Sequence, residues 1–228
     1  MNPSEQQSRS KDILDNPKQD PPTGSHTRSW LVPLLLTLIA VVVGAIVLFD
    51  SNGEIEAVPA EVIRAIGPES APVTVTEYAD FGCISCQAWH QFGIREKILA
   101  QYGDQVRFIW RDFPVTTAQS PLAAEAGLCA HDQGQFWAYH DILFNNAPAF
   151  KEQDLKAYAS AITLESQRFN TCLETGTFRA AVEQARTFAL EQGFRSVPSF
   201  TVNEQRLIGP PSYDQLVVII DEILASSD

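Results

Sequence analysis

A run of twenty residues without a charged side chain divides this chain into two unequal parts. It extends from Trp30 to Phe49 and reads WLVPLLLTLIAVVVGAIVLF. A helix of this length covers the ~30 Å hydrocarbon core of a bilayer, and Pro33 falls in its first turn, where a missing N–H costs nothing. The sequence therefore predicts a single N-terminal transmembrane helix over residues 30–49.

The residues on either side of this run set the expected topology. Arg28 precedes it, whereas Asp50 and Glu54 follow it, which favours a cytoplasmic N-terminus. A cleaved signal peptide is the alternative, but its apolar region is usually ~7–15 residues long and its charged leader is short. We therefore expect an uncleaved, single-pass anchor in the cell membrane. The rest of the chain is then periplasmic or extracellular, where oxidising conditions permit disulfides.

The charges are unevenly distributed along the chain, which carries 28 acidic and 16 basic residues. Residues 1–29 contain equal numbers of each, so the whole acidic excess lies in the remainder. The chain lacks the clustered Lys and Arg that bind phosphates, which argues against a nucleic-acid partner. Residues 1–29 also have too few apolar side chains to form a core. We therefore expect a disordered cytoplasmic tail over residues 1–29, a linker over residues 50–57 and one globular domain over residues 58–228.

The first half of this domain follows the order strand, helix, strand. Val73 to Tyr78 alternates β-branched and polar residues, which is typical of a strand. A helical pattern begins at Cys83 and ends near Gly103, and Val106 to Trp110 forms a second apolar strand. This order predicts a βαβ unit in which the two strands pair in parallel.

The second half of the domain is mainly helical. Almost every segment between about residues 118 and 192 has helical spacing, whereas short strands return at residues 199–202 and 206–208. A capping box over residues 212–215 opens a last helix. We therefore predict an α/β domain with an inserted helical subdomain.

Two cysteines, Cys83 and Cys86, stand where the first strand meets the helix. The free N–H groups at a helix N-terminus carry about half a unit of positive charge and stabilise a thiolate at Cys83. Cys86 lies one turn further along and is placed to close a disulfide with Cys83. A Cys-x-x-Cys pair that follows a strand in an α/β domain is typical of a redox motif.

Four motifs follow one another along residues 58–226. They begin at Ala71 (APVTVTEYADFGCISC), Phe108 (FIWRDFP), Gln133 (QGQFWAYHD) and Gly193 (GFRSVPSF). With these motifs the chain resembles the DsbA-like branch of the thioredoxin fold, whose members are secreted or membrane-anchored thiol-disulfide oxidoreductases. Four ordered motifs are far more specific than one cysteine pair. The resemblance implies a thioredoxin fold with a helical insertion.

The resemblance also implies roles for residues outside the cysteine pair. It implies that Val197 and Pro198 are joined by a cis peptide that packs against the Cys83 disulfide and offers backbone groups to an extended substrate. It implies that Glu77 is a partly buried acid that helps to move protons near Cys86. The alternative for Glu77 is an outward-facing strand residue.

The sequence departs from the family pattern between the two cysteines. Many relatives have Pro after the first cysteine and an aromatic residue or His before the second, whereas this chain has Ile84 and Ser85. Without an intervening His, stabilisation of the Cys83 thiolate is left to the helix terminus and Ser85. We therefore expect a smaller lowering of the pKa of Cys83.

A zinc site is an alternative use of the cysteine pair, because Cys83, Cys86 and His90 fall on one helical face. Structural zinc generally needs four ligands, and no second pair lies at suitable spacing. We therefore expect no metal and place His90 on the helix surface. His131 and His140 have no acid or base partner that the sequence identifies. We expect surface or satisfied core positions for them and assign them no catalytic role.

Cys129 and Cys172 both lie in the helical subdomain. They are either two small buried core residues or a structural disulfide, and an oxidising compartment favours the disulfide. Four cysteines allow three pairings. Only this one also leaves Cys83 and Cys86 to form a redox pair.

The helical subdomain also contains a set of aromatic residues. Such a set could line a peptide-binding groove, but its helical spacing favours packing in the core. The residues are Phe136, Trp137, Tyr139 and Phe144.

These observations predict a membrane-tethered thiol-disulfide oxidoreductase. We expect it to act on exported cysteine-containing proteins through Cys83 and Cys86 without a cofactor. We expect an oxidase, and a reductase is the alternative because it would use the same residues. By the family resemblance, a membrane quinone-linked protein would reoxidise it. The alternative from another class is a non-catalytic, membrane-tethered module that uses the thioredoxin fold to bind a metal or a client.

Overall fold

The computed structural model describes residues 63–226. The expected tail, transmembrane helix and linker lie outside these residues, as do residues 58–62 of the expected domain. Within residues 63–226, no helix combines the length and the apolar character needed to cross a bilayer.

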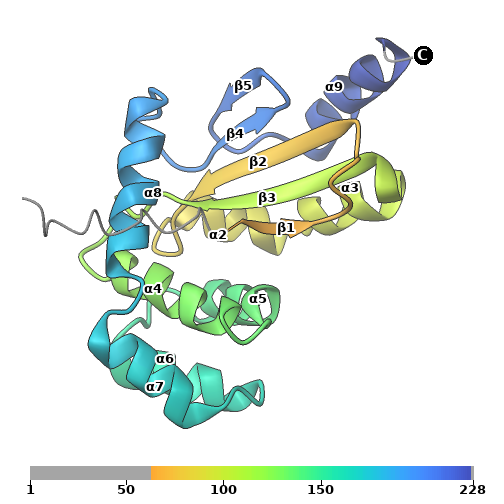
Figure 1. Cartoon of the computed structure of the whole chain (residues 1–228). Helices are drawn as coiled ribbons and strands as arrows, with labels where there is room; N and C mark the ends of the chain where they lie inside the picture. The colour runs from red at the N-terminus through yellow and green to blue at the C-terminus, as the bar shows by residue number, and fades with distance from the viewer. Residues whose placement is uncertain (1–62, 227–228) are drawn as a thin grey trace, which may run out of the picture. The chain divides into compact units, whose positions relative to one another are not determined.

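The described residues form a five-stranded mixed sheet (Figure 1). Its strands are β1 (Arg64–Ile66), β2 (Val73–Ala79), β3 (Val106–Asp112), β4 (Ser199–Val202) and β5 (Gln205–Ile208). The order across the sheet is β1–β3–β2–β4–β5. β2 and β3 pair in parallel, and the other neighbours are antiparallel. The predicted parallel βαβ unit is therefore confirmed.

Helices follow the sheet in two groups. The first group contains α2 (Ile84–Gln91), α3 (Ile94–Tyr102) and the 3-10 turn η2 (Gly103–Gln105) between β2 and β3, and α9 (Tyr213–Ser226) at the end. The second group lies between β3 and β4 and contains α4 (Ser120–His131), α5 (Phe136–Asn146), α6 (Glu152–Ala161), α7 (Ser166–Thr175) and α8 (Arg179–Glu191). Figure 1 shows α4 to α7 as a separate layer below the sheet, with α8 rising from it. The predicted thioredoxin-like fold with a helical insertion is confirmed.

The helix expected after Cys83 is interrupted. α2 ends at Gln91 and α3 begins at Ile94, and between them Gly93 has a left-handed backbone with φ of 62°. Glycine adopts this conformation without steric cost, so Gly93 lets the chain change direction between the two helices. The apolar spacing continues across the break, which is why the sequence predicted one helix.

The edge strand β1 was not predicted. It has three residues, too few for an alternating pattern, and it pairs antiparallel with β3 so that Arg64 lies opposite Trp110. Arg64 is 5% exposed and forms an ion pair with Asp112 at 2.8 Å. Asp112, whose charge offsets the cost of burying Arg64, lies on β3. Only the tertiary structure brings β3 close to β1.

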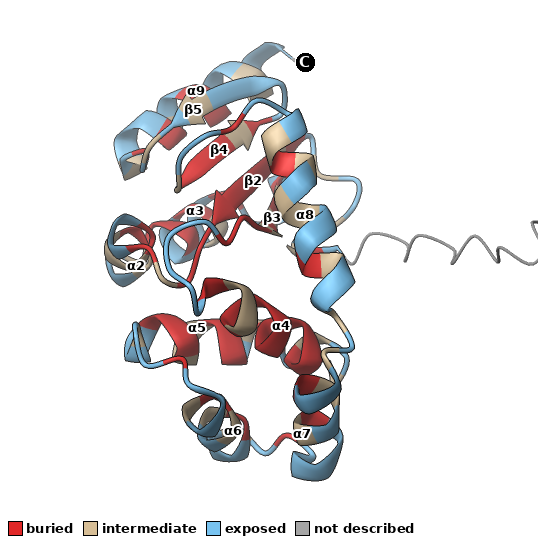
Figure 2. Ribbon diagram, turned by 90° about the vertical axis from the view of Figure 1, so that its left-hand side faces the viewer, coloured by how far each residue is buried: buried red, intermediate tan, exposed pale blue. Residues whose placement is uncertain are grey.

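The largest hydrophobic core lies between the sheet and the helical layer. It contains Phe81 and Trp110 from the sheet side, and Figure 2 shows that α4 and α5 contribute many of the buried residues. Phe81 stacks on Trp110 with ring centroids 4.8 Å apart. Of the aromatic set in the helical subdomain, Trp137 packs against this core and the other three are buried. Their expected packing in the core is therefore confirmed.

Candidate active site

Cys83 occupies the N-cap of α2. Its backbone is extended, and its Sγ accepts a hydrogen bond from the N–H of Cys86 at 3.5 Å. The Cys86 side chain and the N–H groups of Cys86 and Ser85 lower the pKa of Cys83 to about 6, although burial and the charge of Asp80 oppose this. Cys83 is therefore largely a thiolate at neutral pH, the reactive form in thiol-disulfide exchange.

Cys86 lies in the first turn of α2 and is inaccessible to solvent. Burial, the hydrogen bond to Cys83 and the charge of Glu77 raise its pKa. Both cysteines are free thiols in this structure. The two pKa shifts have opposite directions, so Cys83 is suited to attack and Cys86 to act as the protonated resolving thiol.

The peptide between Val197 and Pro198 is cis and leads directly into β4. The Sγ of Cys83 lies 3.5 Å from the carbonyl oxygen of Val197, to which Cys83 donates a hydrogen bond when it is protonated. The side chain of Val197 packs against the core that contains both active cysteines. The structure thus brings together four of the residues singled out in the sequence, which are Cys83, Cys86, Val197 and Pro198.

Glu77 lies on the central strand β2, paired with Trp110 on one side and Phe200 on the other. It is 2% exposed, so the alternative of an outward-facing strand residue is wrong. Burial raises the pKa of Glu77 to about 8, while the charge of Arg95 opposes the shift. Its charge also contributes to the raised pKa of Cys86. A buried acid that titrates near neutrality can exchange a proton with a nearby thiol.

The two residues between the cysteines face outward. Ile84 is 82% exposed, and Ser85 is also exposed. Ser85 acts on Cys83 through its backbone N–H. Ile84 gives the rim of the site an apolar side chain beside the reactive sulfur.

Three potential metal ligands lie close together within the described residues. They are His90, His140 and Asp141, and none of them is a cysteine. The guanidinium of Arg95 lies 3.3 Å from His140 Nδ1 and donates to Asp141 Oδ1 at 3.1 Å. A protein cation therefore already occupies the space beside these ligand atoms, which disfavours a metal ion there.

His140 occupies a core position with a hydrogen-bond partner, as expected, whereas His90 differs from its expected place on the helix surface. His140 is 1% exposed, and its Nδ1 lies 2.8 Å from Asp141 Oδ1, so it does have an acidic partner. Burial lowers the pKa of His140 to about 3, which keeps the ring neutral. His90 stacks on Phe144 instead of lying on an open surface. Both rings belong to the packing between α2 and α5.

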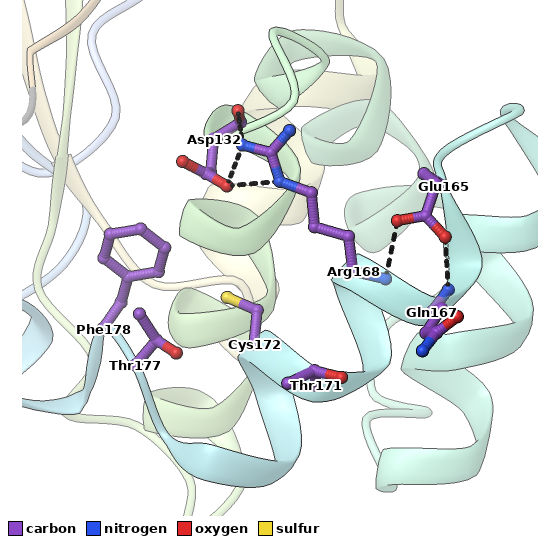
Figure 3. Close-up of a pocket in the computed structure, with 8 residues that line it drawn as sticks. All are labelled: Asp132, Glu165, Gln167, Arg168, Thr171, Cys172, Thr177 and Phe178. Atoms are coloured by element: carbon purple, nitrogen blue, oxygen red, sulfur yellow. Dashed lines mark hydrogen bonds and ion pairs between the residues drawn. The ribbon is translucent and has the colours of Figure 1, made fainter.

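Cys129 and Cys172 form a disulfide between α4 and α7. Cys129 is buried, whereas Cys172 lines a pocket of about 430 Å³ in the helical subdomain (Figure 3). An ion pair between Arg168 and Asp132 borders this pocket. The other residues that line it are Glu165, Gln167, Thr171, Thr177 and Phe178, so it is separate from the Cys83 site.

The parallel β2–α2–β3 unit, the inserted helices and the two closing antiparallel strands form a thioredoxin-like fold. Its Cys-x-x-Cys pair at the start of α2 makes this the fold of a thiol-disulfide oxidoreductase. Comparison with known families agrees, because the model of the thioredoxin family matches residues 60–222. The chain belongs to this family.

Solved structures share the fold. BdbD from Bacillus subtilis, in its oxidised form, superposes with a TM-score of 0.65 at 24% identity, over 71% of this chain and 92% of BdbD. A thioredoxin-like oxidoreductase from Silicibacter pomeroyi gives 0.63 at 25% identity, over 72% and 92% of the two chains. The alpha-DsbA1 protein from Wolbachia pipientis gives 0.63 at 20% identity, over 75% and 94%.

Curated relatives with detectable sequence similarity are much longer proteins. The Na(+)/H(+) antiporter NhaA of Herminiimonas arsenicoxydans is 34% identical over 69% of this chain and 25% of its own length. The Na(+)/H(+) antiporter NhaA 3 of Salinispora tropica is 34% identical over 90% of this chain and 32% of its own length. The chain thus spans about a quarter to a third of these relatives, and the antiporter name describes the longer proteins.

Proposed function

We propose that this chain is a membrane-tethered protein thiol-disulfide oxidoreductase that oxidises exported proteins. The observation that carries the proposal is the pair of opposite pKa shifts at one helix terminus. The pKa of Cys83 is lowered to about 6 by hydrogen bonds from the start of α2, and that of the buried Cys86 is raised. An exposed surface is available next to this pair, because Ile84 points to solvent.

In the oxidising direction the enzyme starts with a Cys83–Cys86 disulfide. A client thiolate attacks the sulfur of Cys83, and Cys86 leaves as a thiolate that takes up a proton, for which Glu77 is the nearby donor. A second client thiolate then attacks the client sulfur of the mixed disulfide and releases the Cys83 thiolate. The client gains a disulfide, and the enzyme disulfide accepts the two electrons.

The low pKa of Cys83 supports the oxidising direction. A stabilised thiolate stabilises the reduced enzyme, which makes its disulfide a stronger oxidant. Cys83 is also the better leaving group in the second step, because a thiol of lower pKa leaves faster. Repeated turnover needs an oxidant for the reduced pair, and we propose a membrane quinone-linked protein in that role.

Cysteine variants of the full-length chain test the exchange function. Cys86→Ala, isolated from cells, should carry client proteins attached through Cys83 and released by dithiothreitol, because the resolving thiol has been removed. Cys83→Ala is the matched control and should carry few clients or none. Equal trapping by both variants would favour a non-catalytic binding module, and a stoichiometric metal in the reduced protein would point the same way.

Equilibration of the full-length chain with glutathione tests the direction of exchange. A reduction potential near about −120 mV would support an oxidase, whereas one near about −270 mV would support a reductase. Both outcomes leave the exchange chemistry of Cys83 and Cys86 intact.

The membrane tether is proposed from residues 30–49, whose apolar run is long enough to cross a bilayer. Protease added outside spheroplasts should digest the domain that follows this run. Protection of that domain, with digestion of residues 1–29 instead, would reverse the topology and place the cysteines in a reducing compartment.

A further inference from the structure

One side chain ties the loop that carries Cys83 to the segment that leads into the helical subdomain. Asp80 follows the last residue of β2 and is 2% exposed. Its Oδ1 accepts a hydrogen bond from the N–H of Gly82 at 2.7 Å. Its Oδ2 accepts hydrogen bonds from the N–H groups of Val115 and Thr116 at 2.8 and 2.6 Å. A single carboxylate therefore joins the segment before Cys83 to the segment between β3 and α4.

Backbone contacts and close packing complete the same junction. The N–H of Cys83 donates to the carbonyl oxygen of Asp80 at 3.0 Å. A Cβ atom on Gly82 would lie 2.7 Å from Ser120 Oγ and 3.0 Å from the Thr117 side chain. The loop therefore lies directly on the start of α4, and the position of the Cys83 sulfur depends on contact between two parts of the domain.

The chemistry of the junction requires a carboxylate. All three groups that hydrogen-bond to the Asp80 carboxylate are N–H donors. A carboxylate offers two acceptor oxygens, whereas the amide of Asn offers one acceptor and one donor. The negative charge is nevertheless unfavourable for the nearby thiolate, because Asp80 raises the pKa of Cys83 against the larger effect of the hydrogen bonds. The charge of Asp80 disfavours the Cys83 thiolate, so its charge does not explain why an acid stands at this position. Its three hydrogen bonds, which hold the loop in place, do.

We propose that Asp80 is a positioning residue that holds the sulfur of Cys83 at the N-terminus of α2 by docking its loop on the segment that leads into α4. This inference deepens the proposed function and rests on it, since Cys83 is the attacking thiol of that proposal. The acidity of Cys83 can be measured whether or not the protein exchanges disulfides with clients. Failure of the positioning role and failure of the exchange function are therefore distinguishable.

Asp80→Asn in the full-length chain tests the proposal, with the pKa of Cys83 measured from the rate of alkylation against pH. Loss of a negative charge alone would lower this pKa, whereas loss of the docked loop would weaken the hydrogen bond from Cys86 and raise it. We expect a rise of about one unit, toward the ~8.5 of a free thiol. An unchanged or lower pKa overturns the proposal. Asp104→Asn removes an exposed acid on η2 and should leave the pKa of Cys83 unchanged.

Gly82→Ala tests the same junction without changing a charge. Its methyl group would press against Ser120 and Thr117 and lift the loop from α4. We expect the pKa of Cys83 to rise in a variant whose circular dichroism remains native. An unchanged pKa in folded Gly82→Ala overturns the proposal, and this variant decides the question if Asp80→Asn does not fold.

Discussion

The sulfur of Cys83 lies 3.5 Å from the carbonyl oxygen of Val197, although 114 residues separate the two along the chain. This contact places the loop before β4 against the reactive thiol. The loop is held there because β4 pairs antiparallel with β2, with Ser199 opposite Tyr78. A client joined to Cys83 must therefore lie beside Val197 and Pro198, and substitutions in this loop should change its release.

Pro198→Thr should prolong the mixed disulfide between Cys83 and a client several-fold. Proline has no N–H, and threonine would add both an N–H and a hydroxyl next to the carbonyl that Cys83 contacts. These groups would hold a client for longer and disturb the approach of the second thiol. Acid quenching of single-turnover reactions measures the lifetime of the mixed disulfide. Pro210→Thr changes an exposed proline and is the control, and equal lifetimes in all three proteins would remove Pro198 from the site.

The reduced protein should become less stable relative to Cys83→Ser as the pH falls from about 8.5 to about 6. The folded state lowers the pKa of Cys83 to about 6, whereas the unfolded chain has the ~8.5 of a free thiol. A lowered folded-state pKa contributes stability that is fully present above the unfolded value and is lost as pH falls through the folded value. Urea unfolding at pH 5, 7 and 9 measures this difference. A pH-independent difference would contradict the stabilised thiolate.

Glu77→Gln should remove the pH dependence of folding stability that the buried Glu77 causes. The folded state raises the pKa of Glu77 to about 8, so the native protein retains a proton that the unfolded chain has lost. Stability should therefore decline as pH rises from about 4.5 to about 8, and the variant should be more stable than the parent at pH 9 by at most about 5 kcal/mol. Denaturant unfolding across this range measures the effect. Glu204→Gln, at an exposed acid, should keep the parental profile.

The Cys129–Cys172 disulfide should remain closed under mild reduction that opens Cys83–Cys86. Cys129 is buried, and closing a separation of 43 residues stabilises the domain by ~4 kcal/mol in the chain-entropy model. Mass mapping of alkylated peptides should find free thiols only at the active pair. The double variant Cys129→Ala/Cys172→Ala should lose stability of about this size in urea unfolding. Two further free thiols after mild reduction would count against a structural bridge.

The sequence was a good guide to local structure. Strand and helix patterns show which face of an element is apolar, and they depend only on neighbours a few residues apart. Such patterns identified the strand over residues 73–78 and the helices over residues 118–192. The sequence was a poor guide where a strand or a break in a helix involves only a few residues. β1 is too short to show alternation, and at Gly93 an unbroken apolar pattern concealed a reversal of the backbone.

The same distinction between local and distant contacts applies to the residues of the candidate site. Cys83 and Cys86 could be assigned from the sequence because their environment, a strand followed by the N-terminus of a helix, is built by adjacent residues. The pairing of His140 with Asp141 could have been suspected from their adjacency, but its burial beside Arg95 could not. The role proposed for Asp80 also lay beyond the sequence, because two of its three N–H partners are 35 and 36 residues away.

The sequence by itself determined the βαβ unit, the helical insertion that follows it, the cysteine pair at the head of α2 and the family resemblance. Only the tertiary structure decided that Glu77 is buried, that Val197 contacts Cys83 and that Asp80 joins two parts of the domain. The physical reason is that helix dipoles and side-chain periodicity act within a few residues. Desolvation and hydrogen bonding of a given side chain depend instead on which distant segments the packed chain places around it.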